Sequence, residues 1–458
     1  MKRKALKITG LFCALAMTAG LLGGCAGQGD SKTEVVRVWT SDAGSKDIMT
    51  KMVSDYNATI GKEEGIQIDY QVFGGDFNQT LNMALESDQA PEMFSAPNDV
   101  RSMVKKGQLL AIEDLPDTEA FLKGYDGELL EDVNVVDGKT YHVPFKVTTT
   151  GLIYNKDLFK KAGIVDEQGE ALPPKTWEEA REYAKRITNE AESTYGFAFP
   201  LKWDSVFYFD FAVPFSTSVP FDGYDFQNGR FDFTVYKPAF EWLTAMKADG
   251  SCFPGAEGLD NDMARAQFAA GRVGMMIGAS WDVSVFSEQF PAQCDWSVAP
   301  APYFEGSERY ASKSTIGPFL AITSEAKKKD LNKISKVYQW FNSKEVLTKL
   351  YEEGYYIPYD ISIIENTTVT TEAKGWAEFA ALLEKQDVVP EPPSVKLEGD
   401  NDYTIYSKIW AGSVNIDEAL KDLTDRNNAA IEKGINDGSI DKSKLVDSSV
   451  KKNPLPKQ

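Results

Sequence analysis

The chain has 458 residues, a formal net charge of −20 and only one histidine, His142. Because nucleic acids and anionic lipids are recognised by basic patches, this acidity argues against both as partners. A single histidine leaves little room for metal sites or for Ser-His and Cys-His nucleophilic machinery. A chain of this length is expected to fold as two domains, since single cores stop growing well before 458 residues.

The N-terminal segment has the pattern of a secretion signal. Lysines and an arginine within residues 2–7 precede an apolar stretch over residues 8–22, which is too short to span a bilayer comfortably. The run Leu22-Gly23-Gly24-Cys25 resembles a bacterial lipobox, which implies cleavage before Cys25 and lipidation of its thiol. The alternative is an ordinary signal peptide with an incidental cysteine. We expect a lipoprotein signal peptide over 1–24, a lipidated flexible tether over 25–33, and a lipid anchor in the cell membrane on its extracytoplasmic face.

From residue 34 onward, patterns typical of strands and helices alternate. The β-branched run 34–39 and the alternating run 66–72 predict strands, and 91–94 predicts a third, short one. Apolar residues at helical spacing predict a helix after each of these strands, over 48–60, 77–85 and 100–107. This order predicts crossover units and a mostly parallel sheet, in which ligands bind beyond the carboxyl ends of the strands. Those ends are the polar segments 39–42, 74–76 and 95–99.

Further landmarks follow along the chain. Residues 137–145 predict a hairpin turn feeding a strand, and Thr176 and Glu179 form a capping-box pattern at the start of a helix. The other landmarks are the runs 148–159, 268–282 and 417–423, the last of which starts another helix.

These landmarks, in this order, resemble the sugar-type solute-binding proteins of ATP-driven importers, the maltodextrin-binding group included. The resemblance spans roughly residues 34–432 and rests mainly on the runs 151–159, 174–179 and 271–275. It implies an α/β fold of the periplasmic binding protein type II kind, with two discontinuous lobes. Each lobe would be a mostly parallel sheet flanked by helices, and a three-crossing hinge would join them.

The resemblance also places the domain boundaries. We expect crossings near 147–150, 312–317 and 356–361. The N-terminal lobe would comprise 34–147 plus 313–357, the C-terminal lobe 148–312 plus 358–449, and residues 450–458 a disordered tail rich in lysine and proline.

Carbohydrates present hydroxyl groups and an apolar C–H face, so their sites combine aromatic platforms with hydrogen-bonding side chains. Trp281, two residues beyond a predicted strand, is the best platform, and packing of its indole into the core of the second lobe is the alternative. For most of the others, core packing, N-capping or a strand-surface position is the alternative to ligand contact. The complete set of candidate ligand-binding residues is Trp281, Asp42, Thr40, Trp39, Asn98, Asp99, Thr148, Trp203, Asp204, Tyr355, Asp400 and Tyr403.

The resulting hypothesis is an extracytoplasmic, lipid-anchored, monomeric protein that captures a carbohydrate, an oligosaccharide above all, in a cleft between the lobes. It would deliver this ligand to an ABC transporter permease, without enzymatic activity, cofactor, metal or nucleic acid. The alternatives are a binding protein for another solute, such as a polyamine, and a secreted glycoside-processing lipoprotein. Cys252 and Cys294 form either a disulfide or two buried free thiols.

Overall fold

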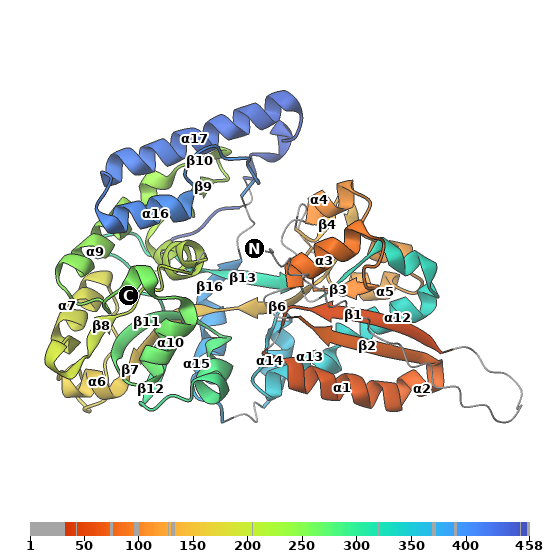
Figure 1. The fold of residues 1–458 in the computed structure, drawn as a ribbon, viewed down its shortest axis with the longest axis horizontal. Coiled ribbons are helices and arrows are strands. Elements are labelled where there is room, and N and C mark those ends of the chain that lie inside the picture. The colour runs from red at the N-terminus through yellow and green to blue at the C-terminus, as the bar shows by residue number, and fades with distance from the viewer. Residues whose placement is uncertain are drawn as a thin grey trace, which may run out of the picture.

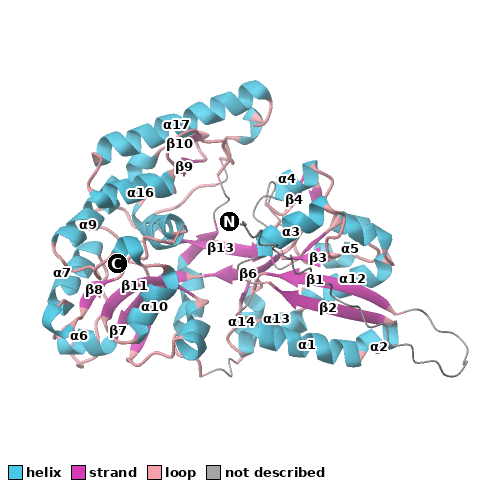
Figure 2. Ribbon diagram, in the orientation of Figure 1, coloured by secondary structure: helices cyan, strands magenta, loops and turns pink. Residues whose placement is uncertain are grey.

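The structure is a computed structural model, and it describes residues 33–42, 44–73, 77–95, 100–126, 128–129, 133–203, 205–318, 320–368, 372–388, 392–448 and 450–455. Two lobes of helices and strands lie side by side and are connected by long strands, as Figure 1 shows. Helices flank the sheet of each lobe (Figure 2), which gives the expected α/β architecture.

The N-terminal lobe contains a four-stranded sheet in the order β14-β3-β1-β2. Its strands are β1 (Glu34–Thr40), β2 (Ile66–Val72), β3 (Met93–Phe94) and β14 (Ala321–Ile322). Strand β1 pairs in parallel with β2 and with β3, whereas the late strand β14 joins the edge antiparallel to β3. The expected parallel crossover units are therefore present, and one distant segment of the chain completes the sheet.

The C-terminal lobe contains a second four-stranded sheet, in the order β12-β7-β11-β8. Its strands are β7 (Thr150–Asn155), β8 (Tyr195–Phe197), β11 (Val273–Ala279) and β12 (Trp296–Ala299). Only β11 and β8 pair in parallel, because β7 runs opposite to both of its neighbours, β11 and β12. As in the first lobe, three of the four strands therefore run in one direction, but here the opposed strand, β7, lies inside the sheet rather than at its edge.

A third sheet forms the hinge between the lobes, in the order β15-β6-β13-β16. It consists of β6 (Pro144–Thr148), β13 (Ser312–Pro318), β15 (Ile357–Pro358) and β16 (Gln386–Val388). Strand β6 pairs antiparallel with β13 and with β15, so the crossings are hydrogen-bonded to one another. In Figure 1, β6 and β13 run from one lobe to the other.

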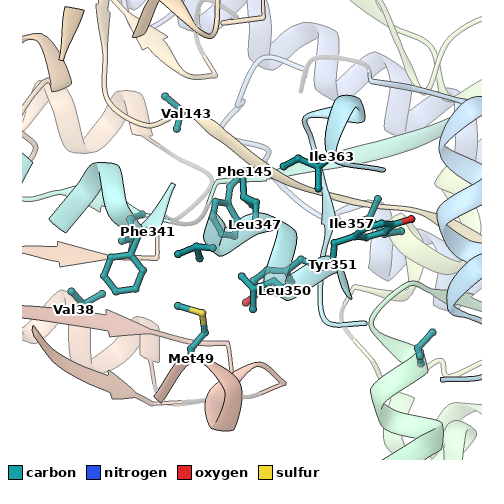
Figure 3. Close-up of a cluster of buried hydrophobic side chains, with 14 of the residues drawn as sticks. Val38, Met49, Val143, Phe145, Phe341, Leu347, Leu350, Tyr351, Ile357 and Ile363 are labelled. Carbon is teal, nitrogen blue, oxygen red and sulfur yellow. The ribbon is translucent and has the colours of Figure 1, made fainter. Parts of the chain in front are cut away.

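A buried apolar cluster anchors the hinge strands in the N-terminal lobe. Figure 3 shows Val38 of β1, Phe145 of β6 and Ile357 of β15 around the same core. Helix α13 (Lys344–Glu352) contributes Leu347 and Leu350 to it. The hinge strands are therefore fixed at one end by the same hydrophobic burial that holds the first lobe together.

The same core corrects one expected boundary. Helix α14 (Ile361–Asn366) packs against α13, and its Ile363 is buried in the cluster of Figure 3. Helix α15 (Trp376–Ala381), by contrast, packs on β12 of the C-terminal lobe. The return to the second lobe therefore lies after α14, not at residue 358, because the apolar face of α14 is covered by the first lobe.

The helices expected from periodicity are confirmed. They are α1 (Lys46–Ala58), α2 (Ile60–Glu64), α3 (Phe77–Glu86), α4 (Val100–Lys105), α7 (Trp177–Ile187) and α17 (Ile416–Asp437). Thr176 and Glu179 form the predicted capping box at the start of α7. The predicted hairpin consists of β4 (Val135–Val136) and β5 (Lys139–Thr140).

The remaining helices cover the sheets and complete the lobes. They are α5 (Glu119–Lys123), α6 (Lys156–Lys161), α8 (Val213–Phe215), α9 (Lys237–Ala248), α10 (Asn261–Ala269), α11 (Asp282–Ser284), α12 (Leu331–Phe341) and α16 (Asp402–Ala411). Helix α17 packs against α16, α9 and the short strand β10 (Arg230–Phe231), which pairs with β9 (Tyr224–Asp225). Among the described residues, no helix combines the length and apolarity needed to cross a bilayer.

The C-terminal segment is more ordered than expected. Residues 450–455 were expected to be a disordered tail, but Lys452 is only 8% exposed and the backbone N–H of Leu455 donates to the carbonyl of Arg309 at 2.7 Å. The prediction is therefore wrong for these residues, because acceptors far away in the sequence hold the tail. Cys252 and Cys294 are both free thiols, and they pack in different apolar clusters.

Candidate functional site

A small pocket of about 60 Å³ lies where the two lobes meet the hinge. The loop after β1 contributes Asp42 and Ser45, and the hinge contributes Lys146 and Tyr356. From the C-terminal lobe, the residues that follow β11 provide the opposite wall, with Trp281 at its centre. Both lobes and the hinge thus contribute side chains to one groove.

Partly exposed aromatic rings continue this groove into the C-terminal lobe. A second pocket is lined by Trp203, Phe209 and, again, Trp281. The rings of Trp203 and Phe209 are stacked, with centroids 5.6 Å apart and an interplanar angle of 11°. Phe209 meets Trp281 edge to face, at 5.1 Å and 79°. All three rings are half-buried, so they form an apolar surface that is packed on one side and open on the other.

Local structure explains how Phe209 reaches this surface. Residues Phe207–Ala212 form a π-helix, a wide turn that is frequent at functional sites. Phe207 and Phe211 are buried in the core of the lobe, whereas Phe209 lies between them on the open side. Sequence reasoning had assigned most aromatics of this region to the core and had not singled out Phe209. The signal that could have identified it is a polar residue, Asp210, inside an otherwise apolar run.

Asp42 is the centre of a polar cluster on the first-lobe side. The Lys146 ammonium lies 2.8 Å from Asp42 Oδ2, and the Tyr356 hydroxyl donates to the same oxygen. The backbone N–H of Ser45 donates to Oδ1 at 3.4 Å, and the ammonium of Lys146 also sits 4.0 Å above the ring centroid of Tyr356. This cluster joins the loop after β1 to two hinge strands, and sequence reasoning had identified only Asp42 in it.

The environment keeps Asp42 ionised. Burial by itself would raise the pKa of this carboxyl, but the charge of Lys146 and the hydrogen bonds from Lys146, Tyr356 and the Ser45 backbone outweigh it. The net result is a pKa below the usual value for aspartate. Burial and the negative charge of Asp42 raise the pKa of Tyr356, so its hydroxyl stays protonated as a donor. The groove therefore presents a fixed negative charge beside a fixed positive charge.

Two further carboxyls lie under the aromatic rings. Asp282 forms a buried ion pair with Arg265, with 2.7 Å between Oδ1 and Nε, and its Oδ2 accepts a hydrogen bond from the backbone N–H of Ala279. Asp210 lines the second pocket and is 6% exposed. Burial and the neighbouring charge of Asp282 raise the pKa of Asp210 well above its usual value. A protonated Asp210 could both donate and accept a hydrogen bond at the floor of the pocket.

Other candidate residues lie in or beside the groove. Thr148 and Tyr355 line the pocket between the lobes and are half-buried. Thr40 is fully buried, and its hydroxyl oxygen accepts the backbone N–H of Asp42 at 3.0 Å. Thr40 therefore supports the loop that carries Asp42 and offers no surface to a ligand in this conformation. Trp39 is half-buried and packs on Phe73, with ring centroids 4.7 Å apart, against a buried cluster of the first lobe.

Asp400 and Tyr403 do not line these two pockets. Asp400 forms an ion pair with Lys408. Tyr403 is half-buried and packs against the core of the C-terminal lobe, where its hydroxyl donates to the carbonyl of Leu201 at 2.8 Å. Four candidates lie outside the described residues: Cys25, Asn98, Asp99 and Asp204.

The groove offers aromatic rings and hydrogen-bonding side chains, and the described residues provide neither a metal-ligand cluster nor a histidine beside it. Within the described part of the chain, no three His, Cys, Asp or Glu side chains gather in a way that could hold a metal ion. His142 is buried away from the groove, where its Nδ1 lies 3.0 Å from the amide nitrogen of Asn134.

Comparison with known proteins agrees with this architecture. The family described as bacterial extracellular solute-binding protein matches residues 42–357, more than half of the chain. The chain belongs to this family. The match confirms the resemblance inferred from the sequence motifs, and it places the protein among binding proteins that face the outside of the cell.

Individual relatives are distant. The sn-glycerol-3-phosphate-binding periplasmic protein UgpB of Brucella melitensis is 24% identical over 388 residues, which cover 78% of this chain and 82% of that protein. A putative binding protein of Brucella abortus is 25% identical over 311 residues, covering 68% and 72%.

Solved structures share the fold. The maltose/maltodextrin-binding domain MalE from Bdellovibrio bacteriovorus, bound to maltotriose, aligns with a TM-score of 0.66 and 18% identity, over 88% of this chain and all of that one. A substrate-binding protein of Listeria monocytogenes in complex with cycloalternan gives 0.65 and 18%, over 88% and 99%. These alignments establish that the chain shares the fold of these binding proteins.

Proposed function

We propose that this protein is a lipid-anchored, extracytoplasmic binding protein that captures a carbohydrate in the groove between its lobes and delivers it to an ABC transporter permease. The carbohydrate is proposed to be an oligosaccharide. Proteins of the same fold have been solved with maltotriose, cycloalternan and acarbose. The chain's own groove supports the same ligand class.

One observation carries the proposal: Trp281 lines both the pocket between the lobes and the pocket of aromatic rings. A sugar ring stacked on this indole would have Asp42 and Lys146 on one side and Phe209 and Trp203 on the other. Stacking supplies affinity for the C–H face of a sugar, and charged hydrogen-bonding groups at the edge satisfy its hydroxyls. Micromolar binding needs about 8 kcal/mol, which one or two stacked rings and several buried hydrogen bonds can supply.

Binding at this place would also drive closure of the lobes. The groove is built from both lobes, so a ligand that touches both walls stabilises the conformation in which they approach. The closed surface is then proposed to be what the permease recognises. Small-angle scattering with and without a bound sugar tests this step, and an unchanged radius of gyration would contradict it.

The ligand class can be tested by thermal shift on the protein without residues 1–25. The panel contains linear maltodextrins, xylo-oligosaccharides, cycloalternan, mannitol, spermidine and sn-glycerol 3-phosphate, the last because of the relatives' ligand. A ligand at 100 times its dissociation constant stabilises the native state by about 2.7 kcal/mol, which is several degrees of melting temperature. A shift with saccharides alone supports the proposal, and a shift confined to spermidine or sn-glycerol 3-phosphate refutes it.

The glycoside-processing alternative makes a different prediction. An enzyme would release product from a chromogenic glycoside or from the saccharide that gives the thermal shift. The proposed binding protein should instead bind that saccharide stoichiometrically and return it unchanged, as chromatography of the released ligand would show. Glycoside-cleaving activity that co-purifies with the protein would favour the enzyme alternative.

The proposed anchor depends on one residue. Cells expressing the full chain with an alkyne-labelled palmitate should label the protein at Cys25, and the variant Cys25→Ser should not be labelled and should appear in the medium or periplasm. Equal labelling of both forms would contradict the lipobox.

A further inference from the structure

A separate cavity of about 440 Å³ lies in the C-terminal lobe, beyond the aromatic rings of the groove. Its size falls within the range of small-molecule sites. It is lined by the segment 220–228, which includes β9, by residues that precede and enter β13, and by residues 450–454 of the tail. In Figure 1, the β9–β10 hairpin and α17 lie above β13 in this part of the lobe. The family match covers residues 42–357 and does not include the tail. The wall that the tail forms therefore lies outside the matched region.

The C-terminal tail forms one wall of this cavity and is held there by specific polar contacts. The Lys452 ammonium is buried, donates to the carbonyl of Ser216 and lies 3.3 Å from Asp222 Oδ1. The side-chain amide of Gln227 donates to the carbonyl of Val450 at 2.8 Å. A buried ammonium needs such partners, because removing one of them would leave an uncompensated charge. The tail is therefore held in one position relative to the segment 216–228.

The lining of the cavity matches the chemistry of a sugar. Phe221 and Phe226 are half-buried and offer apolar faces, while Gln227 and Asn228 offer exposed amides. Asp222 is almost fully buried, and its Oδ2 has no hydrogen-bond partner, although its Oδ1 is paired with Lys452. Asp222 therefore supports the wall of the cavity through its pairing with Lys452.

One lysine contacts both the cavity and the aromatic residues beside the groove. Lys313 of β13 lines the cavity, and its ammonium lies 4.8 Å from the ring centroid of Tyr208. Tyr208 contacts Phe209 edge to face, with centroids 5.0 Å apart, and Phe209 contacts Trp281. Tyr208 and the buried Lys313 therefore lie between this cavity and Trp281.

We propose that this cavity is an additional subsite, walled by the C-terminal tail, that accepts a further sugar unit of an oligosaccharide whose first unit stacks on Trp281. Phe221 covers the C–H face of that unit. This inference rests on the proposed function, and it narrows the ligand to a chain of several sugars rather than a monosaccharide.

Isothermal titration with oligosaccharides of increasing length tests the inference. The probes are linear maltodextrins of two to seven glucose units and xylo-oligosaccharides of two to six units. In the wild-type protein, we expect affinity in the series that binds to rise at least fivefold from the shortest to the longest member. In Phe221→Ala, and in a chain that ends at residue 449, this gain should fall below twofold while the shortest member binds as before.

The matched control is Phe253→Ala, which removes a half-buried ring next to Tyr195, outside the cavity, and should keep the full gain. Phe221→Ala keeps the test decisive if the shortened chain fails to fold. Affinity that does not depend on length, or a full gain in Phe221→Ala, overturns the subsite and leaves the proposed function intact. Failure of every saccharide to bind the wild-type protein overturns the proposed function and the subsite with it.

Discussion

The only histidine of the chain should make the stability of the N-terminal lobe depend on pH. His142 is 3% exposed, and burial lowers its pKa to about 4, with a smaller opposing effect from a backbone hydrogen bond to Val133. The side-chain amide nitrogen of Asn134 is a donor only, so Nδ1 of His142 accepts from it at 3.0 Å and the ring is neutral. His142 also lies two residues before β6, so its state bears on the anchoring of the hinge.

The sign and the magnitude follow from linkage. Between the folded pKa of about 4 and the unfolded value of about 6.5, the unfolded chain binds the proton and the folded chain does not. The contribution of His142 is therefore present at neutral pH and is lost as the pH falls through this window. It amounts to about 2 kcal/mol lost between pH 7 and pH 5, and about 3 kcal/mol by pH 4.

Two measurements check this prediction. Denaturant unfolding of the wild type and of His142→Gln at pH 7, 6, 5 and 4 should show that the difference between them changes by this amount. An NMR titration of the single imidazole, in protein without a histidine tag, should show no protonation above pH 5. An imidazole that titrates near pH 6.5, or a difference between the two proteins that stays constant with pH, would refute the reasoning.

Three further predictions concern the groove and the packing of the second lobe. Trp281→Ala should weaken binding of the saccharide found by thermal shift at least tenfold in calorimetry, because the indole lines both pockets; wild-type affinity would remove it from the site. Asp42→Asn should lower the stability of the first lobe by about 1–3 kcal/mol in denaturant titration, since Lys146 loses its charged partner, and an unchanged midpoint would contradict this. Gly196→Ala should destabilise the C-terminal lobe by about 1–3 kcal/mol in calorimetry, because the added Cβ would lie 2.2 Å from the backbone of α7. The control Gly258→Ala, where no atom lies within 4 Å of such a Cβ, should unfold like the wild type, and equal melting of both variants would show that α7 can shift.

Local features of the fold could be predicted from the sequence because they depend on short-range periodicity. The capping box at Thr176 and Glu179 and the strand 66–72 follow from residues within a few positions of each other. The position of Trp281 just beyond β11 was likewise predictable, because the strand and the residues that end it are adjacent. Its role in binding stays a prediction.

The partners of the site residues could not be predicted in this way. Lys146 reaches Asp42 across 104 positions of sequence, and nothing in the strand that carries it marks this contact. Phe209 was hidden among other aromatics because its exposure depends on a π-helix, which apolar periodicity does not reveal. The order of the tail could not be predicted because its partners are distant in sequence. The burial of Lys452 depends on acceptors 236 and 230 residues away.

The pairing of the hinge strands has a mechanical consequence. Separate linkers would let the lobes slide and rotate independently, whereas β6, β13 and β15 are cross-linked by hydrogen bonds into one narrow ribbon. Such a ribbon is stiff against stretching along its strands and against slip between them, because either movement breaks several bonds at once. Twisting and bending keep the ladder intact and are the soft deformations. The relative motion of the lobes is therefore reduced to a few coupled angles. A substitution that stiffens one of the strands β6, β13 and β15 should restrict the movement of the other two.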